Sequence, residues 1–273
     1  MKKVSVIMAV YNAGDGEALC QAVSSVLRQE YGDFELVICD DGSTDDTWEI
    51  LEQIAASSDK VHIIHNQENR KAGYARNTAL KAATGEFIAI MDADDLIREE
   101  RLARQAEFLE QNPEYGFVGC RGEFFVERPG DDGECYWFCA EPKPENFLFS
   151  LPFVHASVMF RREVLTAVGG YDCSKKAVRA EDFDMLLRIY GAGYRGANLD
   201  EVLYYIRRDE QQYRRRKYRY RFHEAYIKYR GYKNLGLMPQ AFPYVVKPLI
   251  VGLIPMGLMK KIQKKYYADK NQR

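Results

Sequence analysis

Along its first third, the chain alternates runs of apolar residues with segments in which apolar residues recur every three or four positions. The apolar runs lie in VSVIMAV, FELVIC, VHII and FIAIM. Between the first two runs, the apolar residues follow helical spacing at Leu19, Ala22, Val23 and Val26. Continuous apolar runs are typical of strands buried on both faces, and helices between such strands connect them in parallel. The pattern predicts an α/β fold with a mostly parallel, doubly wound sheet and helices on both faces.

Polar residues follow the end of every predicted strand in this region. In open α/β sheets, ligands bind in the crevice beyond the carboxyl ends of the strands. The polar residues at these positions are Tyr11, Asn12, Asp40, Asp41, Asn66, Asp92, Asp94 and Asp95. Taken one at a time, each has a local structural explanation as a turn or helix-cap residue. Taken together, they predict one binding site at this edge of the sheet.

Three of these carboxylates, Asp92, Asp94 and Asp95, crowd into four positions of the stretch MDADDL. Neighbouring carboxylates repel one another and raise each other's pKa, so a cation commonly compensates them. The crowding therefore indicates a cation site directly after the fourth predicted strand, at the same edge as the other polar residues.

Composition narrows the class of protein. The 273 residues are 47% hydrophobic, which is ample for a folded core. A formal net charge of −1 and a pI near 6.5 argue against a nucleic-acid-binding surface, and we expect no nucleic-acid partner. Six cysteines occur without any CxxC pair, which favours a reducing, cytoplasmic location. We find no run of about 20 apolar residues that would predict a membrane span.

Four stretches carry a family resemblance: VSVIMAVYN, FELVICDDGSTDDT, NRKAGYARNTALKAATGEFIAIMDADD and, later, RAEDFDMLLR. Together they resemble family 2 of the inverting glycosyltransferases, enzymes with the Rossmann-like GT-A fold. The resemblance covers roughly residues 2 to 210, and it implies a catalytic domain over 1–210. Within it, 1–95 would be the nucleotide-binding half and 96–210 the acceptor half.

The resemblance implies a metal site. Asp92, Ala93 and Asp94 match the family's DxD motif, in which carboxylates hold Mn²⁺ or Mg²⁺ against the diphosphate of a nucleotide-sugar. Hard oxygen ligands suit both ions, and phosphates commonly complete the coordination shell. The metal would bind the diphosphate and stabilise its charge as it leaves.

The resemblance also implies a set of donor contacts. Tyr11 and Asp41 match positions that contact the base, one with a ring face and the other as acceptor for an imide N–H. Uracil or thymine fits this pairing, guanine stays open, and we favour a UDP-sugar. Arg76 lies in the segment that packs over the nucleotide, although a solvated helix arginine is an equal alternative. Ala9 is expected to lie against the donor as well.

The ED pair of RAEDFDMLLR supplies the chemistry that the resemblance implies. Asp182 matches the general base that takes the proton from the acceptor hydroxyl. Glu181, His155 and Trp137 are candidates for acceptor contacts. Each has a structural alternative: a carboxylate at a helix N-terminus, a buried histidine and a core aromatic residue.

The chain departs from the family pattern at the end of the segment YYIRR. Many members carry a histidine there, whereas this chain has Arg208. An arginine does not ligate a cation, but it can neutralise diphosphate oxygens. We therefore predict a metal held mainly by Asp94 and the donor phosphates. The QxxRW motif of processive synthases is missing from this sequence, which favours transfer of a single sugar.

Residues 211–273 form a basic and apolar extension with helical patterning. Its short apolar stretch between lysine and arginine clusters predicts a peripheral anchor on an anionic membrane surface at the cytoplasmic face. A helix that packs on the catalytic domain is the alternative. The expected function is transfer to a glycan or lipid-linked acceptor in cell-surface polysaccharide biosynthesis. The alternative is a non-catalytic nucleotide- or anion-binding protein that uses its basic tail.

Overall fold

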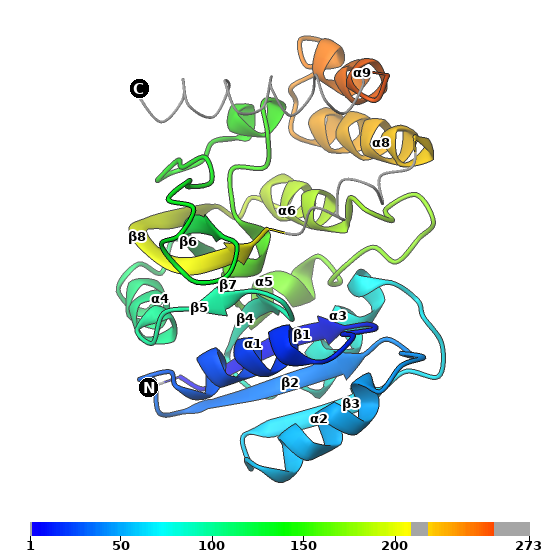
Figure 1. Ribbon diagram of the computed structural model, residues 1–273. Helices are drawn as coiled ribbons and strands as arrows, with labels where there is room; N and C mark the ends of the chain where they lie inside the picture. The colour runs from blue at the N-terminus through cyan, green and yellow to red at the C-terminus, as the bar shows by residue number, and fades with distance from the viewer. Residues whose placement is uncertain (1, 209–217, 254–273) are drawn as a thin grey trace.

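One curled sheet of eight strands forms the centre of the protein (Figure 1). The computed structural model describes residues 2–208 and 218–253. The strand order is β3-β2-β1-β4-β7-β6-β8-β5. The strands are β1 (Val4–Val10), β2 (Phe34–Asp40), β3 (Val61–His65), β4 (Phe87–Asp92), β5 (Leu96–Ile97), β6 (Phe117–Phe125), β7 (Met159–Arg161) and β8 (Gly196–Arg207).

The first four strands confirm the parallel sheet predicted from the apolar runs. β1 pairs in parallel with β2 and with β4, and β2 pairs in parallel with β3. The connecting helices are α1 (Glu17–Leu27), α2 (Thr47–Ala56) and α3 (Ala72–Ala82). Because all four strands run the same way, their carboxyl ends meet at one edge of the sheet. This is the edge at which the polar residues were predicted to converge.

The remaining strands make the sheet mixed. β7 pairs antiparallel with both β4 and β6, while β8 pairs in parallel with β6 and antiparallel with β5. The sheet therefore runs through both predicted halves of the catalytic domain. The helices of this part are α4 (Arg101–Gln111), η1 (Pro144–Leu148), η2 (His155–Ser157), α5 (Arg162–Ala167) and α6 (Glu181–Gly191).

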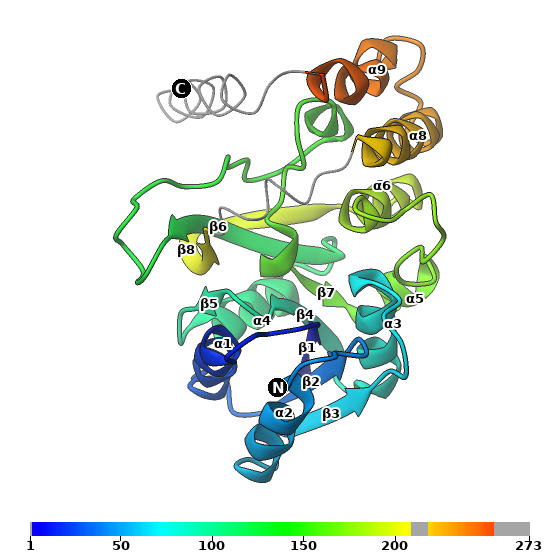
Figure 2. The same cartoon turned by 45° about the vertical axis from the view of Figure 1, so that its right-hand side comes forward.

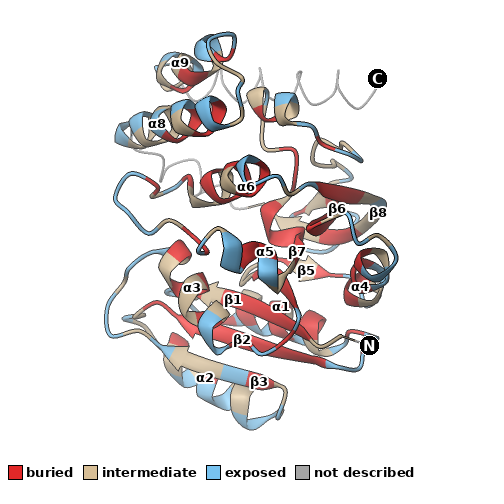
Figure 3. Ribbon diagram, turned by 180° about the vertical axis from the view of Figure 1, so that it is seen from behind, coloured by how far each residue is buried: buried red, intermediate tan, exposed pale blue. Residues whose placement is uncertain are grey.

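Both faces of the sheet are buried along β1, β2 and β4, as their apolar runs predicted. On β1, Val6 and Met8 pack into the core cluster that includes α1 and α4, whereas Ile7 packs into the cluster that includes α3 and α6. Seen from behind, the central strands are almost continuously buried between exposed helix surfaces (Figure 3). Alternate residues of one strand thus serve two separate cores.

A buried carboxylate joins the amino ends of these strands. Glu35 on β2 accepts hydrogen bonds from Ser5 Oγ at 2.6 Å, from the Thr84 backbone N–H at 2.6 Å and from Lys3 Nζ at 2.9 Å. Burial alone would raise the pKa of Glu35, but these hydrogen bonds lower it to about 2. The charged form of Glu35 is therefore the form that stabilises the fold.

We expect Glu35→Gln to lower the free energy of unfolding by about 2 kcal/mol at pH 7. The carboxylate's contribution is present above its unfolded pKa near 4.5 and is lost as the pH falls toward about 2. The difference between wild type and variant should therefore shrink between pH 4.5 and pH 2. Urea titrations across this range measure it, and a difference that does not change with pH would contradict the assignment.

Of the last two described helices, α8 (Arg219–Asn234) packs on α6, and α9 (Phe242–Val251) packs on α8 (Figures 1 and 2). Ile227 and Tyr232 of α8 are buried in the core cluster that includes α6. Gly231 lies so close to α6 that a Cβ atom there would stand 2.3 Å from a side-chain carbon of Leu187. Part of the predicted extension thus packs on the catalytic domain, and its residues 211–217 and 254–273 lie outside the described chain. In residues 2–208 and 218–253 we find no helix with the length and apolar character needed to cross a bilayer.

Candidate active site

The loop after β2 is built around Asp41. This buried carboxylate accepts hydrogen bonds from the backbone N–H groups of Arg70 at 3.1 Å and Lys71 at 2.7 Å, and from the Asn66 amide at 3.2 Å. Burial raises the pKa of Asp41 although these donors act in the opposite direction. Asp41 therefore connects the carboxyl ends of β2 and β3, which brings two of the predicted strand ends together.

Tyr11 stands at the end of β1 with its side chain exposed. The next residue, Asn12, is fixed by hydrogen bonds from its backbone N–H to Ser43 Oγ at 2.9 Å and from the Thr44 N–H to its side-chain oxygen at 2.9 Å. The Tyr11 ring is thus presented to solvent by an anchored loop. Ala9 lies two residues earlier, paired in register with Asp92 on the adjacent strand β4.

The end of β4 carries the DxD motif. Arg76, buried on α3, donates a hydrogen bond from Nη2 to Asp92 Oδ1 at 2.5 Å. Burial disfavours the charged form of Arg76, but the neighbouring Asp92 outweighs it and the net pKa is raised. Arg76 is therefore a charged partner of the motif, and the solvated-arginine alternative does not describe its environment.

The third carboxylate of the stretch has a different environment. Asp95 is buried and accepts hydrogen bonds from Tyr204 Oη at 2.8 Å and from the Arg207 backbone N–H at 2.8 Å. Arg207 also donates from Nε to the Asp94 carbonyl oxygen at 2.7 Å. Burial, with the charges of Asp94 and Asp92, raises the pKa of Asp95 well above its usual value. β8 thus holds the turn that follows β4.

Sequence reasoning missed Tyr204 and Arg207. The family resemblance assigned Asp92 and Asp94 to a metal and gave Asp95 no role of its own, whereas the fold turns Asp95 toward β8. The one available signal was a tyrosine and an arginine within the otherwise apolar stretch LYYIR. That signal does not say which turn these side chains contact, because the contact is set by the pairing of β8 with β5.

The carboxylates of Asp92 and Asp94 could supply some of the ligands of a divalent metal, but not all of them. The Asp94 carboxylate and the Asp92 oxygen that Arg76 does not engage are hard ligands of the kind Mg²⁺ and Mn²⁺ prefer. Among residues 2–208 and 218–253, no three His, Cys, Asp or Glu side chains form a metal-binding group. Two carboxylates suit an ion whose shell is completed by water and ligand phosphates, as Mg²⁺ sites commonly are.

Asp182 lies in the first turn of α6. It is partly exposed, and its Oδ1 accepts a hydrogen bond from the Phe183 N–H at 2.7 Å. Burial and the charge of Glu181 raise the pKa of Asp182 to about 6. The neighbouring Glu181 Oε2 is buried and has no hydrogen-bond partner among the described residues. Asp184, by contrast, is occupied by ion pairs with Arg188 and Arg230.

Arg76 links the DxD motif to α6. Its guanidinium lies 5.7 Å from the Tyr171 ring centroid, and its charge lowers the pKa of Asp182 against the stronger effects of burial and Glu181. Tyr171 Oη lies 3.0 Å from His155 Nε2, and burial beside Arg76 lowers the pKa of His155 to about 3. His155 is therefore neutral at physiological pH and occupies a buried, hydrogen-bonded position.

Arg208 and Trp137 lie in a different environment. Arg208 forms ion pairs with Asp132 and Glu134, and its guanidinium lies 4.4 Å from the Phe124 ring centroid. Trp137 is half-buried in the same irregular segment between β6 and η1. The arginine that contacts the DxD turn is Arg207, whereas the sequence-based prediction was the next residue, Arg208. The donor role of Arg208 and the acceptor role of Trp137 stay predictions.

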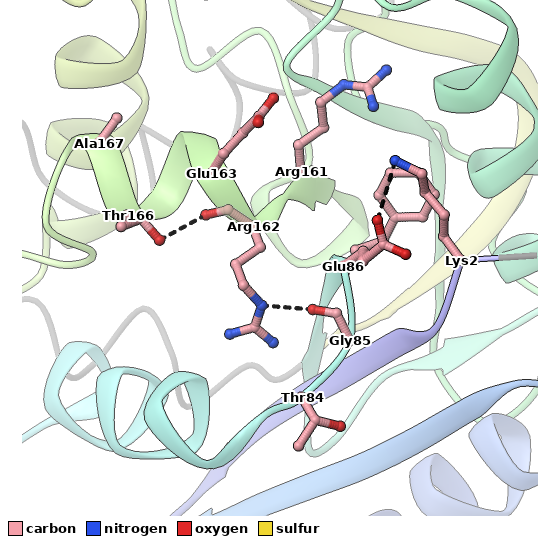
Figure 4. Close-up of a pocket in the computed structure, with 10 residues that line it drawn as sticks. Lys2, Thr84, Gly85, Glu86, Arg161, Arg162, Glu163, Thr166 and Ala167 are labelled. Carbon is pink, nitrogen blue, oxygen red and sulfur yellow. Dashed lines mark hydrogen bonds and ion pairs between the residues drawn. The ribbon is translucent and has the colours of Figure 1, made fainter.

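A hollow of about 670 Å³ lies elsewhere on the molecule (Figure 4). It is lined by residues from the amino ends of β1 and β4 and from α5, with a Lys2–Glu86 ion pair at 3.3 Å. Arg162 Nε donates to the Gly85 carbonyl oxygen at 2.6 Å beside it. None of the predicted site residues lines this hollow, so it is separate from the candidate active site.

Comparison with known sequences identifies similar proteins along the whole chain. The sequence model of the family "Glycosyl transferase family 2" matches residues 5–168, and that of "Glycosyl transferase family group 2" matches residues 87–261. The putative glycosyltransferase EpsE of Bacillus subtilis (strain 168) is 36% identical over 99% of this chain and 96% of its own length. The Escherichia coli protein WfaP, named UDP-Glc:alpha-D-GlcNAc-diphosphoundecaprenol beta-1,3-glucosyltransferase, is 30% identical over 76% of this chain and 78% of its own.

Two solved structures show the same fold. TarS residues 1–349 of S. aureus, in complex with UDP-GlcNAc, superposes with a TM-score of 0.71 at 21% identity, over 90% of this chain and 73% of that one. The mannosyltransferase PcManGT of Pyrobaculum calidifontis, in complex with GDP-Man and Mn²⁺, gives 0.63 at 22% identity, over 97% and 79%. The likeness confirms the fold expected from the sequence.

Proposed function

Because the chain belongs to glycosyl transferase family 2 and has the GT-A fold, we propose that it moves a single sugar, with inversion, from a UDP-sugar to an acceptor hydroxyl. That it is a glycosyltransferase follows from the family; donor, stereochemistry and acceptor are the proposal. One observation carries it: Arg76 forms a hydrogen bond with the DxD turn after β4, and its charge also acts on the ED pair of α6, which is far from that turn in sequence.

UDP as the nucleotide is supported by two comparisons and two side chains. The TarS structure contains UDP-GlcNAc, and the name of WfaP specifies a UDP-Glc donor. In this chain the exposed Tyr11 ring offers a stacking surface for a base. Asp41 supplies the acceptor that an imide N–H would need. PcManGT binds GDP-Man, so a guanine nucleotide is the competing donor to test.

Asp94 and Asp92 would hold the divalent ion of the proposed site, Mn²⁺ or Mg²⁺. When bound, such an ion neutralises the diphosphate and stabilises it as a leaving group. Arg76 has a supporting role, because its hydrogen bond to Oδ1 orients the Asp92 carboxylate. Tyr204 and Arg207 support the same turn through Asp95 and the Asp94 carbonyl.

Asp182 is the proposed general base. It takes the proton of the acceptor hydroxyl as that oxygen forms a bond to the anomeric carbon, while the bond from this carbon to the diphosphate oxygen breaks and UDP leaves. Attack from the side opposite the diphosphate inverts the configuration. A pKa of about 6 leaves Asp182 largely ionised at neutral pH yet more basic than an ordinary aspartate. The unpartnered Glu181 Oε2 is suited to accept a hydrogen bond from the incoming sugar.

The proposed acceptor is a glycan or lipid-linked sugar in cell-surface polysaccharide biosynthesis, used at the cytoplasmic face of the membrane. Its support comes from relatives: WfaP is named for a diphosphoundecaprenol-linked acceptor, and TuaG of B. subtilis, 39% identical over 42% of this chain, is named as a putative teichuronic acid biosynthesis glycosyltransferase. In this proposal, Asp182 deprotonates the acceptor hydroxyl and the donor site supplies the sugar, whether the acceptor is a glycan or a lipid-linked sugar.

Removing divalent metal is expected to abolish donor binding and turnover. With Mn²⁺ and a matching UDP-sugar at 100 times its Kd, the melting temperature should rise by about 5 °C, because ligand binding at that level adds about 2.7 kcal/mol. EDTA should eliminate both the shift and the slow release of UDP. A screen of UDP-, dTDP- and GDP-sugars with Mn²⁺, Mg²⁺ or EDTA measures this. A shift with only GDP-sugars, or one that persists in EDTA, would overturn the donor or the metal assignment respectively.

A further inference from the structure

The outer surface of α8 carries an aromatic face, which consists of Tyr218, Phe222, Tyr226 and Tyr229. All four side chains are exposed, and Phe222 is 56% exposed. They recur at intervals of four, four and three, which places them on one side of the helix. The opposite side packs on α6 through Ile227 and its neighbours. Because surface helices ordinarily turn polar residues to water, this arrangement indicates an interaction surface.

The apolar surface continues onto α9. Phe242, Ile250 and Leu253 are exposed there, the last of them 72% exposed. Tyr218 joins the two helices, because its Oη donates a hydrogen bond to the Leu249 carbonyl oxygen at 3.3 Å. α8 and α9 lie side by side in both views (Figures 1 and 2). The aromatic face and the end of α9 therefore form one connected patch.

Basic residues accompany this patch. The described segment 218–253 contains six Lys and Arg against one Asp or Glu, and Arg219, Lys233 and Lys247 are exposed. The asymmetry extends to the whole sequence. Residues 211–273 hold 16 Lys and Arg against two Asp and Glu, whereas residues 1–210 hold 23 against 38. A chain of nearly zero net charge thus concentrates its positive charge in the part of the sequence that contains the exposed aromatic residues.

The aromatic face is rigidly connected to the helix of the proposed base. Arg230 of α8 donates to Asp172 at 3.1 Å and forms a second ion pair with Asp184 of α6. Asp184 lies two residues after Asp182, in the same first turn of α6. Gly231 allows the two helix backbones to approach closely at Leu187. A surface that binds the aromatic face would therefore act on a helix in direct contact with α6.

We propose that the aromatic face of α8, with the exposed end of α9, docks on an anionic lipid bilayer. Aromatic rings favour the level of the lipid headgroups, and each basic residue near an anionic surface adds about 1 kcal/mol of attraction. Charge complementarity thus favours a bilayer over a second copy of this chain, whose matching patch would carry the same positive charge. The biological purpose, delivery to a lipid-linked acceptor, rests on the proposed function.

Vesicle flotation of the full chain tests the surface without donor or acceptor. We expect the protein to float with vesicles of phosphatidylcholine and phosphatidylglycerol, weakly with phosphatidylcholine alone, and less in high salt. The variant Phe222→Ser/Tyr226→Ser/Tyr229→Ser should partition at least about tenfold more weakly. In Lys233→Gln and Lys247→Gln, loss of each charge should weaken partitioning about fivefold.

Matched changes away from the patch serve as controls. Val126→Ser removes an apolar side chain that is 54% exposed on the loop after β6, and Lys81→Gln removes an exposed lysine of α3. Neither should alter flotation. All variants should keep wild-type melting temperatures and metal-dependent donor binding, which separates loss of docking from misfolding.

Three results would overturn the surface assignment. They are no flotation with anionic vesicles, flotation that survives the triple aromatic change, and a wild-type dimer that this change converts to a monomer. The last would assign the patch to self-association. Because donor binding is measured separately, absent flotation with intact donor binding would reject this inference and leave the proposed function standing. Flotation without any donor binding would do the reverse.

Discussion

Asp182→Asn is expected to lower turnover by a factor of about 100 to 10,000 and, at the same time, to raise the melting temperature. General bases commonly contribute rate factors of this size, and an amide takes no proton from the acceptor hydroxyl. Binding of donor and metal should stay within about twofold of wild type, since Asp182 has no place in the proposed donor site. Steady-state transfer assays, with calorimetry for donor affinity, measure both quantities.

The gain in stability follows from the sign of the pKa shift. Burial beside Glu181 raises the folded-state pKa of Asp182 to about 6, so its ionisation costs stability as the pH rises from about 4 through 6. Asparagine removes that cost. We expect about 1–2 kcal/mol, or roughly 2–6 °C in melting temperature, at pH 7.5. The gain should shrink as the pH falls through 6 and disappear only below about pH 4, where the wild-type carboxyl is protonated in both the folded and the unfolded state.

Asp184→Asn is the matched control, because it makes the same chemical change two residues later on the same helix. Asp184 is buried and paired with Arg188 and Arg230, so this variant should be less stable than wild type at neutral pH. If Asp182→Asn retained more than about a tenth of wild-type turnover, Asp182 would not be the base. If Asp182→Asn were the less stable of the two variants, the raised pKa of Asp182 would be wrong.

Arg207→Met is expected to weaken metal-dependent UDP binding about 10- to 100-fold, the range typical of residues that support metal ligands. The substitution keeps an apolar stem over the Phe125 ring but removes the hydrogen bonds from the guanidinium to the Asp94 carbonyl and to Gln21. The turn that presents Asp94 then loses its charged support. Titration of UDP at several Mn²⁺ concentrations measures the coupling directly and requires no turnover.

The adjacent substitution Arg208→Met provides the comparison. Its side chain is engaged by Asp132 and Glu134, so we expect its removal to change UDP affinity less than about threefold. A purely structural role for Arg207 would lower the melting temperature without altering affinity below the transition. If Arg208→Met had the larger effect on UDP binding, the result would support the sequence-based prediction that Arg208 contacts the diphosphate. It would also argue against a supporting role for Arg207.

The parallel half of the fold was predictable because its signals are local. Each strand from β1 to β4 is a continuous apolar run, and each helix between them has its own period, so element type follows from a short window. The clustering of strand-end polar residues was predictable for the same reason, because parallel strands place their carboxyl ends together.

The individual roles within the DADD stretch were not predictable in this way. Asp92 and Asp95 differ because Arg76 reaches one from α3 while Tyr204 reaches the other from β8. The position of Tyr204 is set by the pairing of β8 with β5 and β6 in the mixed half of the sheet, which leaves no periodic trace in the DADD stretch itself. The choice of Arg207 over its neighbour has the same origin, since adjacent residues of a strand point to opposite faces.

Because β8 supports the DxD turn, the order in which the chain leaves the ribosome affects when this turn can form its hydrogen bonds. A chain under synthesis exposes β1 to β4, with all three aspartates, long before Tyr204 and Arg207 leave the ribosome. N-terminal parts fold first as they emerge, so the predicted nucleotide-binding half, residues 1–95, is present for a time without the strand that holds its DxD turn. Assembly of the donor site is therefore delayed until nearly the whole catalytic domain exists. A prematurely ended chain that stops before β8 would carry every carboxylate of the motif and still lack the hydrogen bonds that position it.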